Sequence, residues 1–353
     1  MKVDITRITI EKVTQSKLDK SSLINRKFGE TFTDHMFICT YKHGAWQDAK
    51  ITAYKPLQLE PSARVFHYGQ AVFEGMKAYK DTEGDVFLFR PDENQYRINK
   101  SAERMAMPAF PKDLFFEGLE TLLRLEKDWV PSANGNSLYI RPFMIATGKG
   151  IFAAPSEEYT FMIICSPSGK YYGKDVKVVI AEDYSRAANG GVGAAKAAGN
   201  YGAQFYPTQI AIDLGYDQII WTDSTNTYLE EAGTMNIFVR INDVLITAPT
   251  SDRILDGVTR KSIIAIAKHE NIPVEERAIS INEIKEAALN GSLKDMFGTG
   301  TAAVIVPISH FSHMGKDYKI NRVENRYSDF FKKRLTDIQY NRSEDVFGWR
   351  YKI

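Results

Sequence analysis

The sequence predicts a mixed α/β (α+β) protein with two domains, and three observations support this. The chain has 353 residues, which is enough for two hydrophobic cores. Short apolar runs that are typical of strands recur in both halves, between segments with helical spacing. Neither half alternates strands and helices as a doubly wound parallel sheet does, so we expect largely antiparallel or mixed sheets. A linker rich in glycine, lysine and tyrosine (168–175) separates a smaller N-terminal domain (1–167) from a larger C-terminal domain (176–353).

The elements expected in the first domain follow from apolar spacing and helix-end signals. A short strand over 86–90 follows a turn at Gly84. Pro91 then begins a polar helix over 91–107, because proline suits the first helical position. Leucines and aromatic residues near helical spacing predict a second helix over 113–130. The runs SLYIRPFMIATG and YTFMIICSP predict two long strands.

The second domain is expected to begin with the strand VKVVIAE and to continue with one helix over 200–215. DQIIWTD, MNIFVRI and VLITAPT are predicted strands, and the last two form a hairpin across Asn242 and Asp243. DGVTRKSIIAIAKHENI predicts another helix. Ser280 and Glu283 form a capping box at the start of a further one.

Composition excludes several classes of protein. Apolar residues make up 44% of the chain and the net charge is +1, which argues against disorder and gives no sign of a nucleic-acid or membrane partner. No apolar run approaches the roughly 20 residues of a membrane-spanning helix, and the N-terminus has no hydrophobic signal core. Cys39 and Cys165 lie in apolar runs and are expected to be buried thiols of a cytoplasmic protein. His310 and His313 have no further ligands nearby, so we expect no metal site.

One segment, RAANGGVGAAKAAGNYGAQ (186–204), surrounds Lys196 with glycine and alanine. Small residues let a ligand approach the main chain closely. A P-loop needs glycine before the lysine and a hydroxyl after it, but Ala195 and Ala197 occupy these positions. A dinucleotide fingerprint fails because Lys196 stands where its third glycine belongs. Two interpretations remain open: a lysine that forms a Schiff base, and a solvated lysine in a flexible loop.

Three other segments would suit a phosphorylated Schiff-base cofactor. LDGVTRKSI places Val258 and Thr259 at a helix N-terminus, where free N–H groups can bind phosphate. FGTGTAAV (297–304) is a second small, hydroxyl-bearing turn. YLEEAGTMNIF carries Glu230 and Glu231, and a carboxylate there could face a pyridinium nitrogen. Taken singly, each segment also fits an ordinary helix cap, hairpin turn or solvated acid pair.

Together, these segments resemble the fold-type IV pyridoxal-phosphate enzymes, and most closely the branched-chain amino acid aminotransferases. The resemblance runs in family order over nearly the whole chain. It implies an active site between the two domains, with the cofactor bound mainly by the larger one. The matching segments are FHYGQAVFEGMKAY, FRPDENQYRINKSAERM, LYIRPFMIATG, GGVGAAKAAGNY, EEAGTMNIF, ILDGVTRKSI and FGTGTAAVIVP.

The resemblance implies a role for each residue that contacts pyridoxal 5′-phosphate. Lys196 would hold the cofactor as a Schiff base and move the proton between Cα and C4′. Tyr201 would hydrogen-bond the phenolic oxygen. Glu231, five residues before the asparagine of its motif, would face the pyridine nitrogen in preference to Glu230. The implied phosphate contacts are Arg97, Val258, Thr259 and Thr301.

The resemblance also implies a substrate pocket with an aromatic, mostly apolar wall. One arginine in that wall would help to bind the distal carboxylate of glutamate, and two turns would offer amides to the α-carboxylate. The implied wall is Tyr68, Phe73, Tyr139 and Arg141, and the implied turns are at Thr234, Ala302 and Ala303.

The sequence departs from the family pattern at two places. Ala198 replaces the first of two glycines that commonly precede the asparagine, which adds a methyl group close to Lys196. Mammalian members carry a C-x-x-C after the GTGTA-type turn, whereas this chain has Ala303 and Val306. Thiol regulation is therefore not expected at that turn.

The implied reaction transfers the amino group of L-leucine, L-isoleucine or L-valine to 2-oxoglutarate, giving branched 2-oxo acids and L-glutamate. The resemblance also implies a homodimer. The sequence does not rank the three substrates. A D-amino acid aminotransferase or an aminodeoxychorismate lyase would share the fold, and a non-catalytic vitamin-B6-binding or scaffold protein is an alternative from another class.

Overall fold

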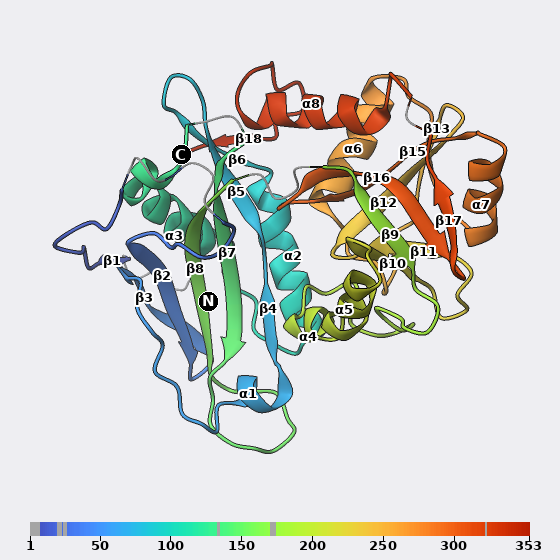
Figure 1. Ribbon diagram of the computed structural model, residues 1–353. Helices are drawn as coiled ribbons and strands as arrows, with labels where there is room; N and C mark the ends of the chain where they lie inside the picture. Colours follow the sequence, from blue (N-terminus) through green and yellow to red (C-terminus); the bar gives the residue numbers. More distant parts are fainter. Residues whose placement is uncertain (1–7, 20–22, 24–26, 133–134, 170–173, 322) are drawn as a thin grey trace. The chain divides into compact units, whose positions relative to one another are not determined.

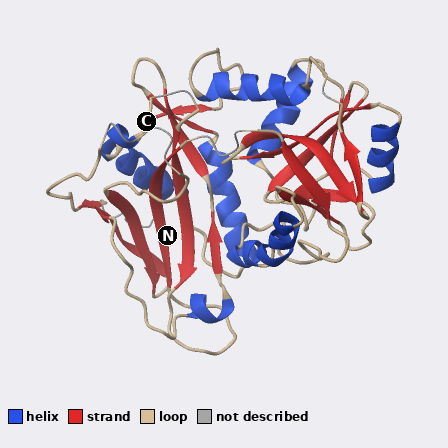
Figure 2. Cartoon of the chain, in the orientation of Figure 1, coloured by secondary structure: helices blue, strands red, loops and turns tan. Residues whose placement is uncertain are grey.

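The computed structural model describes the chain except residues 1–7, 20–22, 24–26, 133–134, 170–173 and 322. The chain forms two compact units (Figure 1). Each unit combines helices with one large sheet (Figure 2). In the described part of the chain, no helix has both the length and the apolar character needed to cross a membrane. The first unit comprises Met1–Tyr171, Ala195–Ala198 and Ile338–Ile353, and the second comprises Tyr172–Ala194 and Gly199–Asp337.

These units differ from the predicted halves in two places. Residues 338–353 lie in the first unit because β18 (Arg350–Lys352) pairs antiparallel with β6 (Val86–Phe89). Residues 195–198, which carry the lysine, also belong to the first unit. The middle of the predicted linker lies outside the described residues, and the domain boundaries drawn from the sequence stay a prediction.

The sheet of the first unit has the strand order β1-β3-β2-β8-β7-β5-β6-β18, with β4 also pairing with β7. Every pairing is antiparallel except that of β1 with β3, so the predicted fold class is correct for this unit. The remaining strands are β1 (Thr9–Ile10), β2 (His35–Lys42), β3 (Ala45–Ala53), β4 (Ala71–Phe73), β5 (Met76–Lys80), β7 (Ser137–Ala146) and β8 (Tyr159–Ser168).

The two predicted helices of this unit are present but shorter than expected. The first ends at Arg104, because Ala106 adopts a left-handed conformation (φ 53°) and Pro108 cannot continue a helix. The second ends at Leu125 and is followed by a 3₁₀ turn, η2. The helical elements are α1 (Arg64–Tyr68), α2 (Pro91–Arg104), α3 (Lys112–Leu125) and η2 (Lys127–Trp129).

Aromatic stacking dominates the core of the first unit. The rings of Phe110 and Phe161 stack with centroids 3.7 Å apart, and Phe37 and Phe115 pack edge-on against Phe161. Both cysteines are buried, as the sequence predicts. Burial raises the pKa of the Cys39 thiol to about 12 and that of Cys165 well above its ordinary value.

The sheet of the second unit is mixed, with the order β11-β10-β9-β16-β15-β12-β13-β14. An additional pairing of β11 with β12 closes six of these strands into a ring, and β17 pairs with β16. The strands are β9 (Val176–Ile180), β10 (Gln218–Thr222), β11 (Leu229–Ala232), β12 (Met235–Ile241), β13 (Val244–Thr247), β14 (Val274–Glu276), β15 (Leu293–Gly300), β16 (Val304–His313) and β17 (Lys316–Lys319).

The single helix predicted over 200–215 is wrong, because two helices occupy this stretch. Pro207 lies in the first turn of the second one, where its missing N–H is tolerated, but it would break a continuous helix. The capping box is confirmed: the Ser280 side chain accepts a hydrogen bond from the Glu283 amide at 3.0 Å. The helices are α4 (Ala198–Gly202), α5 (Phe205–Asp213), α6 (Val258–His269), α7 (Ile281–Leu289) and α8 (Tyr327–Gln339).

Candidate active site

Lys196 is held through its backbone by two elements of the first unit. Its amide donates to Ser101 Oγ of α2 at 2.8 Å, and its carbonyl accepts from the Phe73 amide at 3.1 Å. The next residue, Ala197, forms a β-bridge with Val72. The Lys196 amine lies 4.8 Å from the centroid of the Phe73 ring. The small residues of the segment therefore let the chain pack closely against β4 and α2.

Arg97 makes a two-point ion pair with Glu74, a residue that the sequence analysis did not single out. Arg97 Nε donates to Glu74 Oε1 at 2.7 Å, and Nη2 donates to Oε2 at 2.9 Å. Asn94 Nδ2 donates to Oε2 at 2.7 Å. The Glu74 side chain is fully buried. Burial acts to raise the pKa of Glu74, but Arg97, Lys196 and Asn94 together lower it below its ordinary value.

Three of the four predicted wall residues lie together near this pair. The Arg141 guanidinium lies 4.6 Å from the centroid of the Phe73 ring and donates to Tyr139 Oη at 3.0 Å. Gly75 leaves room for that hydroxyl, because a Cβ there would collide with it. Tyr68, the fourth, lies on α1 and donates its hydroxyl to the carbonyl of Ile151.

Three residues of the second unit contact the Glu231 carboxylate. Oε1 accepts from the Leu255 amide at 2.7 Å and from Asn236 Nδ2 at 3.4 Å, and Oε2 lies 3.1 Å from Arg186 Nε. Glu230 points to the opposite face of the strand and pairs with Arg253. The two adjacent acids therefore have different partners, and the alternation of side chains along a strand is the reason.

The N-terminus of α6 lies beside the Glu231 cluster. The helix begins at Val258 with Gly257 as its N-cap, and its first turn carries no acidic side chain. A Cβ on Gly257 would collide with Asn236 Oδ1, so glycine is required for this approach. Val258 and Thr259 are buried. The partial positive charge of a helix N-terminus suits an anion.

The two turns predicted to bind a carboxylate are neighbours in the second unit. Thr234 is exposed between β11 and β12, whereas 301–303 is half-buried between β15 and β16. A Cβ on Gly300 would lie 3.9 Å from the Thr234 carbonyl oxygen. Next to them, Thr299 pairs with Asn236 across the sheet. Its buried hydroxyl has no hydrogen-bond partner in the described part of the chain.

The donor set fits pyridoxal phosphate. Thr299 supplies a buried hydroxyl that a polar ligand could satisfy, and the N-terminus of α6 supplies an anion site. Glu231 is a carboxylate that accepts hydrogen bonds, which is the chemistry needed opposite a protonated ring nitrogen. Lys196 supplies the amine. Tyr201 lies half-buried in α4. Lys196 and Glu231 belong to different units, so their meeting in one site stays part of the proposal below.

Some neighbours of these residues were missed in the sequence analysis. Asn94 and Ser101 recur at helical spacing with the predicted Arg97 on one buried face of α2, a signal that the sequence does contain. Arg186 and Glu74 gave no local signal, because their partners lie 45 and 23 positions away along the chain.

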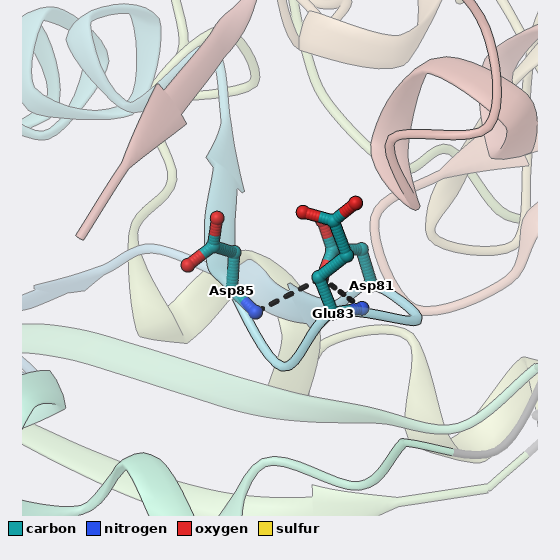
Figure 3. Close-up of side chains that lie close together, drawn as sticks. All are labelled: Asp81, Glu83 and Asp85. Carbon is teal, nitrogen blue, oxygen red and sulfur yellow. Dashed lines mark hydrogen bonds between the residues drawn. The ribbon is translucent and has the colours of Figure 1, made fainter.

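One turn of the first unit gathers three carboxylates, those of Asp81, Glu83 and Asp85 (Figure 3). Their oxygens lie within 4.8 Å of one another. Asp81 accepts from the amides of Glu83 at 3.0 Å and Asp85 at 2.9 Å, and from Asn341 Nδ2 at 2.9 Å. The Asp81 carboxylate therefore stabilises the turn, and we assign no metal to this cluster.

The comparison with protein families identifies the class. Residues 71–311 match the family model for class IV amino-transferases, so the chain belongs to this family. Within that class it groups with the branched-chain-amino-acid transaminases, as its relatives show. It is 47% identical to branched-chain-amino-acid transaminase 1 of Bacillus subtilis, over 96% of both chains. It is 41% identical to aminotransferase 2 of the same organism, over 99% of this chain and 98% of the relative.

Solved structures of lower identity share the fold. A branched-chain aminotransferase from Thermoproteus uzoniensis superposes with a TM-score of 0.76 at 23% identity, covering 90% of this chain and 99% of that one. The Escherichia coli branched-chain amino acid aminotransferase gives a TM-score of 0.75 at 24% identity, covering 90% of this chain and 98% of that one. The predicted fold-type IV architecture is therefore confirmed.

Proposed function

We propose that this chain is a pyridoxal-phosphate-dependent transaminase that reversibly moves the amino group of L-leucine, L-isoleucine or L-valine to 2-oxoglutarate. The products are the branched 2-oxo acids and L-glutamate. The observation that carries the proposal is the similarity to branched-chain-amino-acid transaminases over nearly the full length of the chain. The hydrogen bonds that fix the Lys196 backbone and the Glu231 carboxylate agree with this similarity.

Pyridoxal 5′-phosphate is the proposed cofactor. Two solved structures of another branched-chain amino acid aminotransferase that shares the fold contain N-(5′-phosphopyridoxyl)-L-glutamate and pyridoxamine 5′-phosphate. When bound, the cofactor supplies an electron sink for carbanion chemistry. Lys196 would bind its aldehyde and accept and return the substrate Cα proton, and Glu231 and Tyr201 would orient the ring. The proposed phosphate contacts are Arg97, Val258, Thr259 and Thr301.

The proposed substrate pocket combines apolar rings with one cation. Phe73 and Tyr139 offer ring surface to a branched side chain, and Arg141 lies against both rings, where it could pair with the distal carboxylate of glutamate. One methylene in such a pocket is worth about 1–3 kcal/mol, so all three branched substrates should be accepted. Tyr68 completes the proposed wall, and the proposed α-carboxylate contacts are the turns at Thr234, Ala302 and Ala303.

A homodimer and a cytoplasmic location complete the proposal. Both come from the sequence analysis, and sedimentation of the purified chain would test the first. A mass close to that of one 40.0 kDa chain would contradict it.

Borohydride reduction of the cofactor-loaded protein tests the function directly. Peptide mapping should find a reduced pyridoxyl group on Lys196, and a label elsewhere would contradict the proposal. A visible spectrum recorded with L-leucine, D-alanine and aminodeoxychorismate in turn separates the alternatives. The spectrum should respond to L-leucine, whereas a response confined to one of the other two compounds would identify a different class IV enzyme.

A further inference from the structure

Glu74 lies where two cationic groups of the proposed site come together. Its amide donates to the Pro142 carbonyl at 2.7 Å, and the residue before it, Phe73, donates to the Lys196 carbonyl. The backbone at Phe73 and Glu74 is therefore fixed. The Glu74 side chain ends between Arg97 and Asn94 of α2. The Lys196 amine lies 4.8 Å from the ring centroid of Phe73, the residue directly before Glu74.

One face of α2 contacts both Glu74 and the segment that carries Lys196. Asn94 and Arg97 both donate to the Glu74 carboxylate, and Ser101, one turn further on, accepts from the Lys196 amide. Asn94 and Ser101 are 2% and 1% exposed. A single helix thus positions the acid and the lysine segment together, and neither can shift without losing buried hydrogen bonds.

The charges around this group favour an ionised carboxylate. Arg97 is 9% exposed on its side chain, and Arg141 of β7 lies over the same Phe73 ring as the Lys196 amine. Several cations close together repel one another, and a buried charge without a counter-ion is costly.

We infer that Glu74 is a positioning residue: it fixes the Arg97 guanidinium and acts as the counter-ion that lets Arg97 and the Lys196 amine lie close together before a ligand binds. The role in positioning rests on the proposed function. The inferred electrostatic coupling between Glu74 and the amine does not rest on that function, because both groups belong to the chain itself.

The test is competitive labelling of the cofactor-free, full-length chain with trace acetic anhydride across a pH series. Mass spectrometry of the Lys196 peptide gives the pH midpoint at which the amine becomes reactive. In Glu74→Gln that midpoint should fall by about one unit or more, because the nearby negative charge that favours the ammonium is gone. The matched control is Glu103→Gln, an exposed acid of α2 that pairs with Lys100, and it should leave the midpoint unchanged.

A second measurement is the affinity of the chain for pyridoxal phosphate. Its dissociation constant, followed by absorbance, should rise about tenfold or more in Glu74→Gln, because Arg97 loses its two-point partner. Equal midpoints in Glu74→Gln and the unaltered chain would overturn the inference.

If Glu74→Gln does not fold, Glu74→Asp keeps the charge on a shorter side chain. Its labelling midpoint should stay within about half a unit of the unaltered value, while cofactor binding weakens. A midpoint that falls by a full unit although the charge is kept would overturn the inference. Failure of the proposed function would appear separately, as a missing borohydride label on Lys196 in the unaltered chain.

Discussion

Two glutamates of the first unit are both deeply buried, yet their pKa values are shifted in opposite directions. Glu74 is surrounded by Arg97, Lys196 and Asn94, and its pKa is lowered although burial alone would raise it. Glu126 pairs with His35 and lies near Asp34. Its pKa is raised, mainly by burial and further by the Asp34 charge, against the opposing effect of His35. At a similar degree of burial, the partners therefore decide the direction in which the pKa of a carboxyl group is shifted.

The difference separates a cluster that stabilises the fold from one that contains predicted site residues. The Glu126 cluster ties one strand to the end of α3 and involves no predicted site residue. The Glu74 cluster includes the predicted reactive lysine and the predicted phosphate ligand. The following substitutions test this difference.

The largest expected effect is that of Lys196→Ala, which removes the amine from the Glu74 cluster. Amino transfer should fall to the uncatalysed background, because the amine that binds the aldehyde and moves the proton is gone. Lys100→Ala, an exposed lysine of α2, is the matched control. Steady-state turnover of L-leucine with 2-oxoglutarate measures both. Normal turnover by Lys196→Ala would show that the reactive lysine is wrongly assigned.

The second-largest effect is expected for Glu231→Gln, which should lower kcat on the order of 10²-fold. Cofactor retention should change less, because the phosphate contacts remain. Glu230→Gln, its neighbour on the opposite face of the strand, should have a much smaller effect on kcat. Cofactor loss with unchanged kcat in the loaded fraction would contradict the assigned role.

Arg97→Ala should weaken cofactor binding and also destabilise the fold. It leaves the Glu74 carboxylate buried without its main partner, a change that typically costs about 3–5 kcal/mol. Absorbance titration gives the dissociation constant, and urea unfolding of the cofactor-free chain gives the stability. An unchanged dissociation constant would argue against the phosphate contact.

The smallest effect is the pH dependence of stability, which should have opposite signs for the two glutamates. Glu74 has a lowered pKa in the folded state, so its contribution is present above its ordinary value and is lost as the pH falls. Glu126 has a raised pKa, so its contribution is present at low pH and is lost as the pH rises through the folded-state value.

Unfolding free energies between pH 3 and pH 7 measure this difference. Glu74→Gln should remove part of the loss of stability in acid, and Glu126→Gln should remove part of the loss toward neutral pH. A shift of one pKa unit corresponds to about 1.4 kcal/mol. The same sign of change in both variants would contradict the comparison.

The sequence predicted much of the local structure, since helix ends and strands depend on near neighbours. Pro91 begins α2, Ser280 caps α7, and the hairpin turns at Asn242, where asparagine tolerates a φ of 51°. The helix over 200–215 was predicted wrongly because the pattern gave too little weight to Pro207. The return of 338–353 to the first sheet could not be predicted, because strand pairing over such a distance leaves no local pattern.

By itself, the sequence determined the family, the reactive lysine as a hypothesis and the turns that suit a phosphate. These are carried by short motifs whose residue order is preserved along the chain. Only the tertiary structure decided that Glu74 joins Arg97 to the lysine segment, that Glu230 and Glu231 face opposite ways with different arginines, and that Gly257 must lack a Cβ beside Asn236. The physical reason is that a buried charge takes its state from partners that the fold, and not sequence proximity, brings within hydrogen-bonding distance.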